Sequence, residues 1–249
     1  MISSREWKRG KSKEITFIVT KDCQLACKYC YQVGKNNSER LTWDIAKKGV
    51  DFILSQDTEE WLDIDSVIFS FIGGEPFLEI ELIDRICDYL KIQMYQKEHH
   101  WFNSYRFAIT TNGINYNNPK VQRFVQKNFK HLSITITIDG TQKKHDLNRI
   151  WKSSKNSDLT NRGSYENVVK NIPLWLSQFP NAATKVTISS ADIPYICESV
   201  LHLYSLGIHI VYINCVFENV WHEGDDILFE KQLKMLADYI VENHLYKNY

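Results

Sequence analysis

The chain has no excess of charge of either sign and no long apolar run. Its 249 residues carry 30 Lys and Arg against 30 Asp and Glu, so net charge gives no reason to expect nucleic acid or a membrane surface as a partner. No apolar stretch approaches the ~20 residues that a membrane-spanning helix needs, and the first residues lack the apolar core of a secretory signal. Only five Pro and ten Gly interrupt the chain. This composition indicates a packed globular protein.

Cysteine is scarce and unevenly placed. Six cysteines in a chain of this length do not make a disulfide-rich scaffold. Three of them, Cys23, Cys27 and Cys30, lie within eight residues, a bunching that no disulfide framework would show and that favours a reducing cytoplasm. The others are isolated, and we expect Cys87 and Cys197, which lie in predicted helices, to be buried as small apolar side chains.

Short apolar runs alternate with amphipathic stretches along the chain. The expected strands are 15–20, 66–72, 105–110, 131–138, 185–189 and 208–214. The expected helices are 44–55, 79–97, 119–129, 164–177, one capped by Asp192 and ended by Gly207, and 226–246, with a long polar insert at 141–162. Six consecutive β–α units predict an α/β fold, a partial and open (β/α)6 barrel of the TIM type in a single domain over residues 1–249.

Polar or glycine-rich motifs directly follow four of these strands. They are the loop with the three cysteines, Gly73-Gly-Glu-Pro76, Thr111-Asn-Gly113 and Asp139-Gly140. Ligands of such sheets sit at the carboxyl ends of the strands, so we expect the four motifs to meet at one rim. Two further residues at strand ends, Ser189 and Asn214, are candidate contacts there.

The spacing C-x3-C-x2-C suits an iron–sulfur cluster. Three thiolates so close together can hold three irons of a cubane cluster and leave the fourth iron open for chemistry. The alternative is a structural zinc site with His145 or His99 as the fourth ligand. Zinc sites usually show two pairs of ligands, and no second pair exists in this sequence.

Together these motifs resemble those of radical S-adenosylmethionine (radical SAM) enzymes. The cysteine loop, with an aromatic residue at Tyr29, matches the signature of that superfamily, and the Gly-Gly-Glu-Pro run matches its second motif. The segment Thr137-Ile-Asp-Gly140, followed by His145, Asp146 and Arg149, is similar to a segment of sulfatase maturases and ribosomal-peptide maturases. The resemblance runs in register from about residue 13 to residue 215.

The resemblance implies two cofactors and a reaction type. Cys23, Cys27 and Cys30 would hold a [4Fe-4S] cluster whose open iron binds S-adenosylmethionine. One electron would split the sulfonium C–S bond and give a 5′-deoxyadenosyl radical, which takes hydrogen from a substrate. The implied partners are a peptide or protein substrate and an electron donor such as flavodoxin or ferredoxin.

The same resemblance assigns cofactor contacts. Glu75 suits the cationic groups of the cofactor, Arg149 can pair with its carboxylate, and Tyr29 would lie near the adenine. The remaining expected contacts are Gly73 and Gly74, which permit a close backbone approach, and Thr111, Asn112, Thr137 and Ser189. No residue stands out as a general base or hydrogen donor.

Maturases of this group usually carry a cysteine-rich C-terminal extension, of the SPASM or twitch type, and no C-x2-C pair follows Cys30. We therefore expect a catalytic core without auxiliary clusters, which is either part of a longer protein or a short enzyme. The leading reaction is a thioether or related cross-link in a ribosomally made peptide. The alternatives are formylglycine formation in a sulfatase, a small-molecule reaction, and a non-catalytic iron–sulfur or zinc module.

Overall fold

The computed structural model describes residues 11–32, 37–152 and 163–248. The chain divides into two compact units, and each is described by itself. The first consists of Met1–Gln24, Gln32–Thr111 and Asn115–Ile134, and the second of Leu25–Tyr31, Asn112–Ile114 and Thr135–Tyr249. Among the described residues, no helix has both the length and the apolar character that crossing a bilayer requires.

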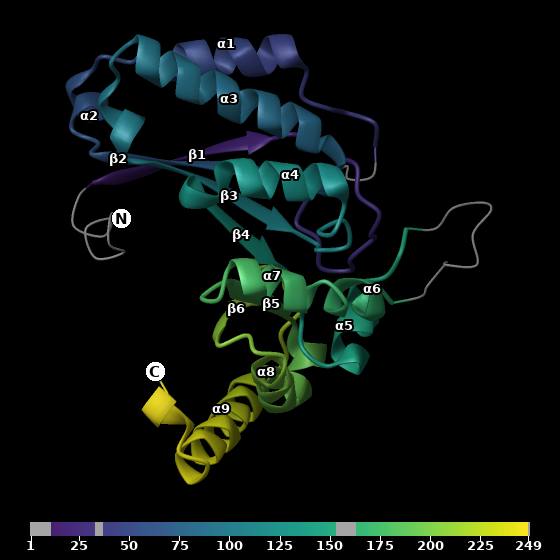
Figure 1. The fold of residues 1–249 in the computed structure, drawn as a ribbon. Coiled ribbons are helices and arrows are strands. Elements are labelled where there is room, and N and C mark those ends of the chain that lie inside the picture. Colours follow the sequence, from purple (N-terminus) through teal and green to yellow (C-terminus); the bar gives the residue numbers. More distant parts are fainter. Residues whose placement is uncertain (1–10, 33–36, 153–162, 249) are drawn as a thin grey trace. The chain divides into compact units, whose positions relative to one another are not determined.

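A four-stranded sheet forms the centre of the first unit (Figure 1). Its strands, in the order β1-β2-β3-β4, are β1 (Ser12–Ile18), β2 (Ser66–Ile72), β3 (Tyr105–Thr111) and β4 (Leu132–Ile136). The helices are α1 (Trp43–Ile53), α2 (Glu59–Leu62), α3 (Ile80–Gln96) and α4 (Pro119–Asn128), with 3-10 turns η1 (Pro76–Glu79), η2 (His100–Asn103) and η3 (Phe129–His131). The pairs β1–β2 and β2–β3 are parallel, as predicted.

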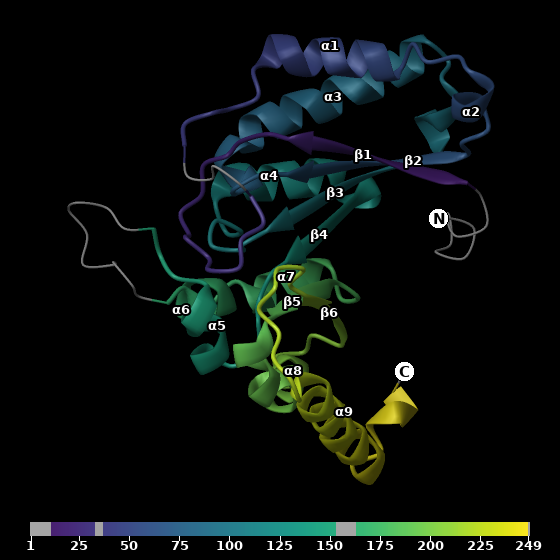
Figure 2. The same cartoon turned by 180° about the vertical axis from the view of Figure 1, so that it is seen from behind.

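Aromatic side chains fill the core of the first unit. Phe17 stacks on Phe71 with ring centroids 5.5 Å apart, and Phe69 lies 6.2 Å from Phe107 on the neighbouring strand. Figures 1 and 2 show α1 and α3 side by side along the sheet. Each buried ring contributes about 1.5–3 kcal/mol relative to an exposed one, so the packing of the helices on the sheet holds this unit together.

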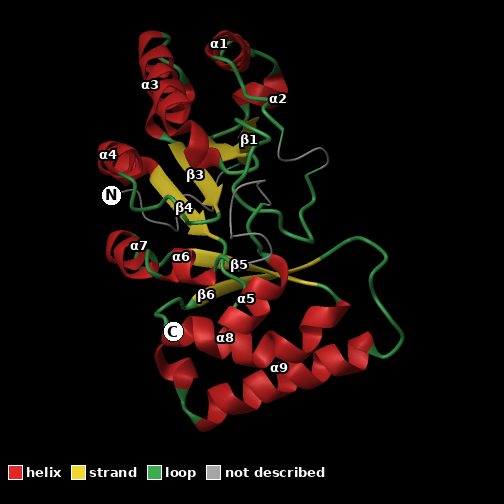
Figure 3. Cartoon of the chain, turned by 90° about the vertical axis from the view of Figure 1, so that its right-hand side faces the viewer, coloured by secondary structure: helices red, strands yellow, loops and turns green. Residues whose placement is uncertain are grey.

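The second unit is built on a parallel pair of strands, β5 (Ala183–Ile188) and β6 (Ile210–Cys215). Just after β4, Thr137 forms an isolated parallel bridge to Lys185 of β5. The helices are α5 (Gln142–Asn148), α6 (Tyr165–Val169), α7 (Ile172–Gln178), α8 (Ile196–Ser205) and α9 (Asp225–Glu242), with 3-10 turns η4 (Ser190–Tyr195) and η5 (Leu245–Asn248). Figure 3 shows α8 against α9. The predicted α/β class is confirmed, because parallel strand pairs occur in both units, with helices between the strands along the chain.

Two local predictions between β4 and β5 are wrong. The expected polar insert at 141–162 contains α5, and its residues 153–162 lie outside the described residues. The expected helix at 164–177 is broken into α6 and α7. Pro173, in the first turn of α7, has no N–H to continue the earlier helix, and the Asn171 amide donates to the Gly113 carbonyl at 2.8 Å.

The start of the helical segment after β5 also differs from the prediction. Ser189, and not Asp192, is the N-cap residue, while Asp192 at the third position accepts from the Ser189 N–H at 2.8 Å. This is a capping box, and a 3-10 turn precedes α8. Gly207 ends that helix as predicted, with a φ of +86° that glycine adopts readily. The isolated Cys87 and Cys197 are buried, as expected.

His99, at the start of η2, makes the first unit sensitive to acid. Its Nδ1 accepts from the Trp101 N–H at 3.2 Å. Burial, aided by the charges of His100 and Lys97, lowers the pKa of His99 from 6.5 to about 4. The folded state therefore favours the neutral ring, so the stabilisation is present above pH 6.5 and is lost as the pH falls toward 4.

We expect the free energy of unfolding to fall by about 1 kcal/mol on this account between pH 7 and pH 5, after allowance for partial exposure. The His99→Asn variant keeps a capping acceptor and has no titrating ring, so its loss over the same range should be smaller by that amount. Urea unfolding at both pH values measures the difference. Equal pH dependence in the two proteins would contradict the assignment.

Candidate functional site

The Gly-Gly-Glu-Pro turn packs directly against the chain that leads into the cysteines. The Gly74 N–H donates to the Thr20 carbonyl and the Glu75 N–H to the Asp22 carbonyl, both at 2.8 Å. A Cβ on Gly73 would lie 2.4 Å from the Thr20 oxygen, and one on Gly74 would lie 2.1 Å from the Asp22 oxygen. These two positions therefore require glycine, because the backbone just before Cys23 approaches them closely. Their contact with a cofactor stays a prediction.

Glu75 follows the turn and is completely buried. Its Oε1 accepts from the Phe77 N–H at 3.0 Å and from the Thr111 hydroxyl at 2.6 Å. The carboxyl group thus joins the end of β2 to the end of β3, and two predicted site residues, Glu75 and Thr111, are brought together. A buried carboxyl with an ordered environment is suited to recognise a cationic group.

Within the second unit, residues 25–31, which form the later part of the cysteine loop, are hydrogen-bonded to the chain at the end of α5 and just after it. The Ala26 N–H donates to the Ile150 carbonyl at 2.8 Å, and the Lys28 N–H to the Asn148 carbonyl at 3.0 Å. An antiparallel bridge joins Leu25 to Trp151. Backbone pairing therefore fixes the stretch that contains Cys27 and Cys30.

Tyr29 provides the side-chain part of this attachment. Its hydroxyl donates to Oδ2 of Asp139 and accepts from Nη1 of Arg149 at 3.1 Å. Burial raises the pKa of Tyr29 well above its ordinary value, and the neighbouring Asp139 and Cys27 act in the same direction, against Arg149. Burial by itself would lower the pKa of Arg149, yet Tyr29, Cys27 and Asp139 hold it well above its ordinary value. Tyr29 is thus a neutral phenol beside a permanent cation.

His145 orients this segment. Nδ1 of His145 accepts from the Asp139 N–H at 3.3 Å, and Nε2 lies 3.0 Å from the Ser164 hydroxyl, which donates to the Arg149 carbonyl. Burial lowers the pKa of His145 well below 6.5, so the ring is neutral. Both ring nitrogens are engaged, which disfavours His145 as the fourth ligand of a zinc site.

The three cysteines of the motif are not in disulfides, and each is partly exposed. Within the described part of the chain, no three His, Cys, Asp or Glu side chains are already grouped as a metal-binding set. The assignment of Cys23, Cys27 and Cys30 as cluster ligands therefore rests on their spacing and on the family described below, and it stays a prediction.

The remaining predicted contacts have local roles in the structure. The Asn112 side chain accepts from the Ile114 N–H at 2.9 Å, which makes an Asx-type turn after β3. Thr137 is half-buried beside β5. The Ser189 hydroxyl donates to Asp192 at 2.7 Å. Their contact with a cofactor, and the meeting of all four motifs at one rim, stay predictions.

Two buried charged residues near this site were missed by the sequence analysis. Lys144 lies on α5 with a side chain that is 1% exposed, and Asp192 is 2% exposed. A lysine in a predicted polar insert carries no signal of burial. The position of Asp192 before a predicted helix indicates a cap, and this pattern gives no sign that its second carboxyl oxygen has a partner.

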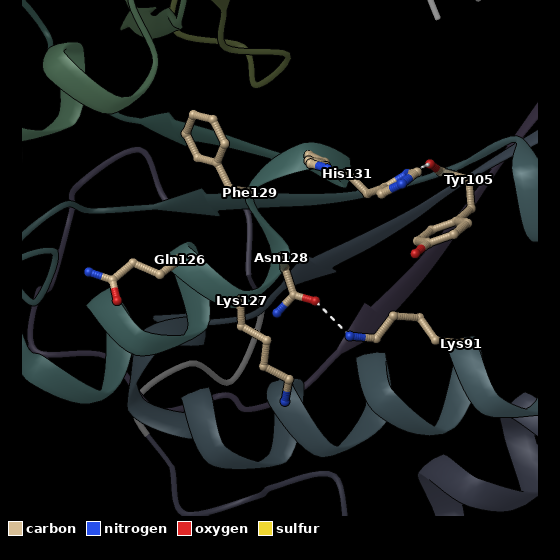
Figure 4. Close-up of a pocket in the computed structure, with 8 residues that line it drawn as sticks. Lys91, Tyr105, Gln126, Lys127, Asn128, Phe129 and His131 are labelled. Atoms are coloured by element: carbon tan, nitrogen blue, oxygen red, sulfur yellow. Dashed lines mark hydrogen bonds between the residues drawn. The ribbon is translucent and has the colours of Figure 1, made fainter. Parts of the chain in front are cut away.

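A separate pocket of about 330 Å³ lies in the first unit (Figure 4). It includes Tyr105, the first residue of β3, and the residues before β4, so it is at the amino ends of these strands. Two of its cations have acidic partners: Lys91 lies 3.0 Å from Asp88, and Lys127 contacts Asp84. Because ligands of such sheets sit at the carboxyl ends of the strands, this pocket is a weaker candidate than those ends.

The Glu75–Thr111 contact yields a stability prediction. Thr111→Val removes a hydrogen bond to a buried carboxyl group and should lower the free energy of unfolding by about 1.5–3 kcal/mol. Thr16→Val, on the exposed face of β1, is the matched control and should change it by no more than about 0.5 kcal/mol. Urea unfolding monitored by tryptophan fluorescence measures both, and equal effects would refute the role of Thr111.

Comparison with known proteins places these features in a family. The model of the family described as "4Fe-4S single cluster domain" matches residues 10–160, more than half of the chain. An uncharacterized protein of Methanocaldococcus jannaschii is 28% identical over 197 residues, which is 79% of this chain and 60% of that protein.

Solved structures share the fold at low identity. The structure of anSMEcpe with bound AdoMet and a peptide aligns with a TM-score of 0.71 at 17% identity, over 96% of this chain and 62% of that chain. Streptococcus suis SuiB bound to its precursor peptide SuiA aligns with a TM-score of 0.62 at 13% identity, over 94% and 47%. The radical S-adenosylmethionine methyltransferase TsrM of Kitasatospora setae aligns with a TM-score of 0.50 at 9% identity, over 85% and 38%.

The chain thus spans about 60% of the length of the curated relative and of anSMEcpe. It belongs to the 4Fe-4S single cluster domain family and has the fold of the radical SAM superfamily.

Proposed function

We propose that this chain is a radical SAM enzyme that cleaves S-adenosylmethionine reductively at a [4Fe-4S] cluster and uses the resulting radical to modify a peptide. The observation that carries the proposal is the C-x3-C-x2-C triplet in the loop after β1 of a chain that belongs to the single-cluster family. When bound, the reduced cluster and S-adenosylmethionine supply a 5′-deoxyadenosyl radical that abstracts hydrogen.

The donor set fits the cluster. Cys23, Cys27 and Cys30 are partly exposed and are not in disulfides, and thiolates are the usual ligands of iron–sulfur centres. Three cysteine ligands would leave one iron for the amino and carboxylate groups of the methionine part of the cofactor. None of the six cysteines, all of which lie in the described residues, forms a disulfide, which agrees with a cytoplasmic, reducing location as part of the proposal.

Each unit also has groups that suit S-adenosylmethionine. Arg149 is buried, and its Nε has no hydrogen-bond partner, so it retains a donor for a carboxylate. The buried carboxyl group of Glu75 is suited to the cationic end of the cofactor. The Tyr29 ring is the proposed neighbour of the adenine, with its hydroxyl already held by Asp139.

A peptide substrate is the best-supported choice. Of the solved structures with this fold, anSMEcpe was obtained with a bound peptide and SuiB with its precursor peptide. We propose a thioether or related cross-link in a ribosomally made peptide, with electrons from a flavodoxin- or ferredoxin-type donor. Formylglycine formation in a sulfatase is the alternative. The products differ, because a thioether retains the cysteine sulfur and formylglycine made from cysteine does not.

Reconstitution tests the radical chemistry. The wild-type chain, loaded anaerobically with iron and sulfide and reduced with dithionite, should convert S-adenosylmethionine to 5′-deoxyadenosine and methionine. Cys27→Ala should give no 5′-deoxyadenosine above the protein-free background, because one cluster ligand is lost. Chromatography with mass detection measures the products.

Cys87→Ala is the matched control. Its thiol is buried in α3, away from the motif, so the variant should retain the wild-type yield. The radical proposal fails if the reconstituted wild type forms no 5′-deoxyadenosine, and the module alternative is then favoured. It also fails if Cys27→Ala and wild type give equal yields.

A further inference from the structure

Lys144 sits in a buried cluster of charges in the second unit. Its Nζ lies 3.9 Å from Oδ2 of Asp139 and 4.0 Å from Oδ1 of Asp192, and the three side chains are 1%, 0% and 2% exposed. The ammonium group also donates to the carbonyl of Thr187 at the end of β5. A lysine is rarely buried to this degree unless paired, so the site requires these partners.

Each carboxyl group next to Lys144 holds a different predicted site residue. Asp139 accepts from the Tyr29 hydroxyl in the cysteine loop and from the Thr187 N–H at 3.2 Å. Asp192 accepts from the Ser189 hydroxyl at 2.7 Å and from the Asn148 amide at 2.8 Å. Lys144 therefore lies between Asp139, which binds the cysteine loop, and Asp192, which belongs to the polar turn after β5.

The formal charges in this cluster balance. Lys144 and Arg149 supply two positive charges, and Asp139 and Asp192 supply two negative ones. Burial lowers the pKa of Lys144, while Asp139 and Asp192 act to raise it. Removal of one member of such a buried set leaves an uncompensated charge, and the hydrogen bonds of its neighbours then rearrange.

We propose that Lys144 is a positioning residue whose buried ammonium group fixes, through Asp139, the part of the loop that bears Cys27 and Cys30, and fixes, through Asp192, the Ser189 turn. The inference deepens the proposed function and rests on it, since the loop is taken to hold the cluster. One buried cation thus holds both the loop and the turn in place, and without it the two elements would move independently.

Hydrogen exchange on the 249-residue chain, before cluster loading, tests the positioning. Lys144→Met retains the length of the side chain and removes its charge. The amides of residues 25–31 and 189–192 should exchange about tenfold faster or more, while those of β2 and β3 stay as in wild type. Lys143→Met is the matched control, because Lys143 is the exposed neighbour on α5, and it should leave both segments protected.

The cluster's reduction potential provides the readout that a merely structural role would not move. In the reconstituted protein, a potentiometric titration followed by electron paramagnetic resonance should give a lower potential for Lys144→Met than for wild type, because a buried positive charge near the loop is lost. Lys143→Met should titrate like wild type.

If Lys144→Met does not fold, the double variant Lys144→Met/Asp192→Asn is used in its place. This variant restores the charge balance of the buried cluster. Residues 25–31 should still exchange faster in the double variant, because Asp139 has lost its ammonium partner. Wild-type protection of these residues, or an unchanged potential in a folded Lys144 variant, would overturn the proposal. Failure of the wild type to assemble a cluster would instead refute the proposed function, and the exchange result still decides the role of Lys144.

Discussion

The hydroxyl of Tyr29 is the contact on which the arrangement of the second unit's site depends. It joins the cysteine loop to Asp139 at the end of β4 and to Arg149 after α5. Two backbone hydrogen bonds, from Ala26 and Lys28, run beside it. A loop without helix or sheet of its own gains a defined course in this way. Without that attachment, two of the three clustered thiols would be carried on a segment with few constraints.

The contact of Tyr29 with Asp139 requires a buried carboxylate, which is costly in free energy unless its charge is compensated. Asp139 is completely buried, and a buried carboxylate is tolerated only when hydrogen bonds and opposite charges compensate for lost water. The Thr187 N–H in β5 and the cations of Lys144 in α5 and Arg149 at the C-cap of α5 meet that requirement from two separate segments. His145 contributes as a neutral ring that positions backbone and adds no further charge. The same set of groups leaves Nε of Arg149 with a spare donor, which is where a bound carboxylate is proposed.

In the first unit, the turn after β2 lies close to the backbone of the segment that leads into the cysteines. Gly73 and Gly74 allow the turn after β2 to touch the backbone of Thr20 and Asp22, at distances that a side chain would prevent. Glu75 then takes its place beneath the turn and binds Thr111. The glycine motif and the approach to Cys23 are thus one packed structure, so that the geometry near the first cysteine depends on the absence of two Cβ atoms.

Hydrophobic periodicity predicted all six strands to within three residues at each end, because strand burial is written in the alternation of neighbouring residues. Local chemistry also identified the first turn of α4 at Pro119 and the end of α8 at Gly207. Local patterns did not predict features that depend on contacts between residues far apart in the chain. The break between α6 and α7 involves the hydrogen bond from Asn171 to the Gly113 carbonyl. Asp192 accepts a hydrogen bond from the Ser189 N–H in the capping box, and it also lies beside Lys144.

The sequence by itself determined the order of the β–α units, the spacing of the three-cysteine motif and the glycine turn, because each is encoded in residues that are close along the chain. Only the tertiary structure decided that Tyr29 binds Asp139 and Arg149, and that a lysine of a polar segment is buried between two aspartates. The contacts of Tyr29 with Asp139 and Arg149, and of Lys144 with Asp192, join residues separated by 48 to 120 positions in the chain. Burial and pairing of charge over such separations arise only when the strands have assembled, and no local pattern records them.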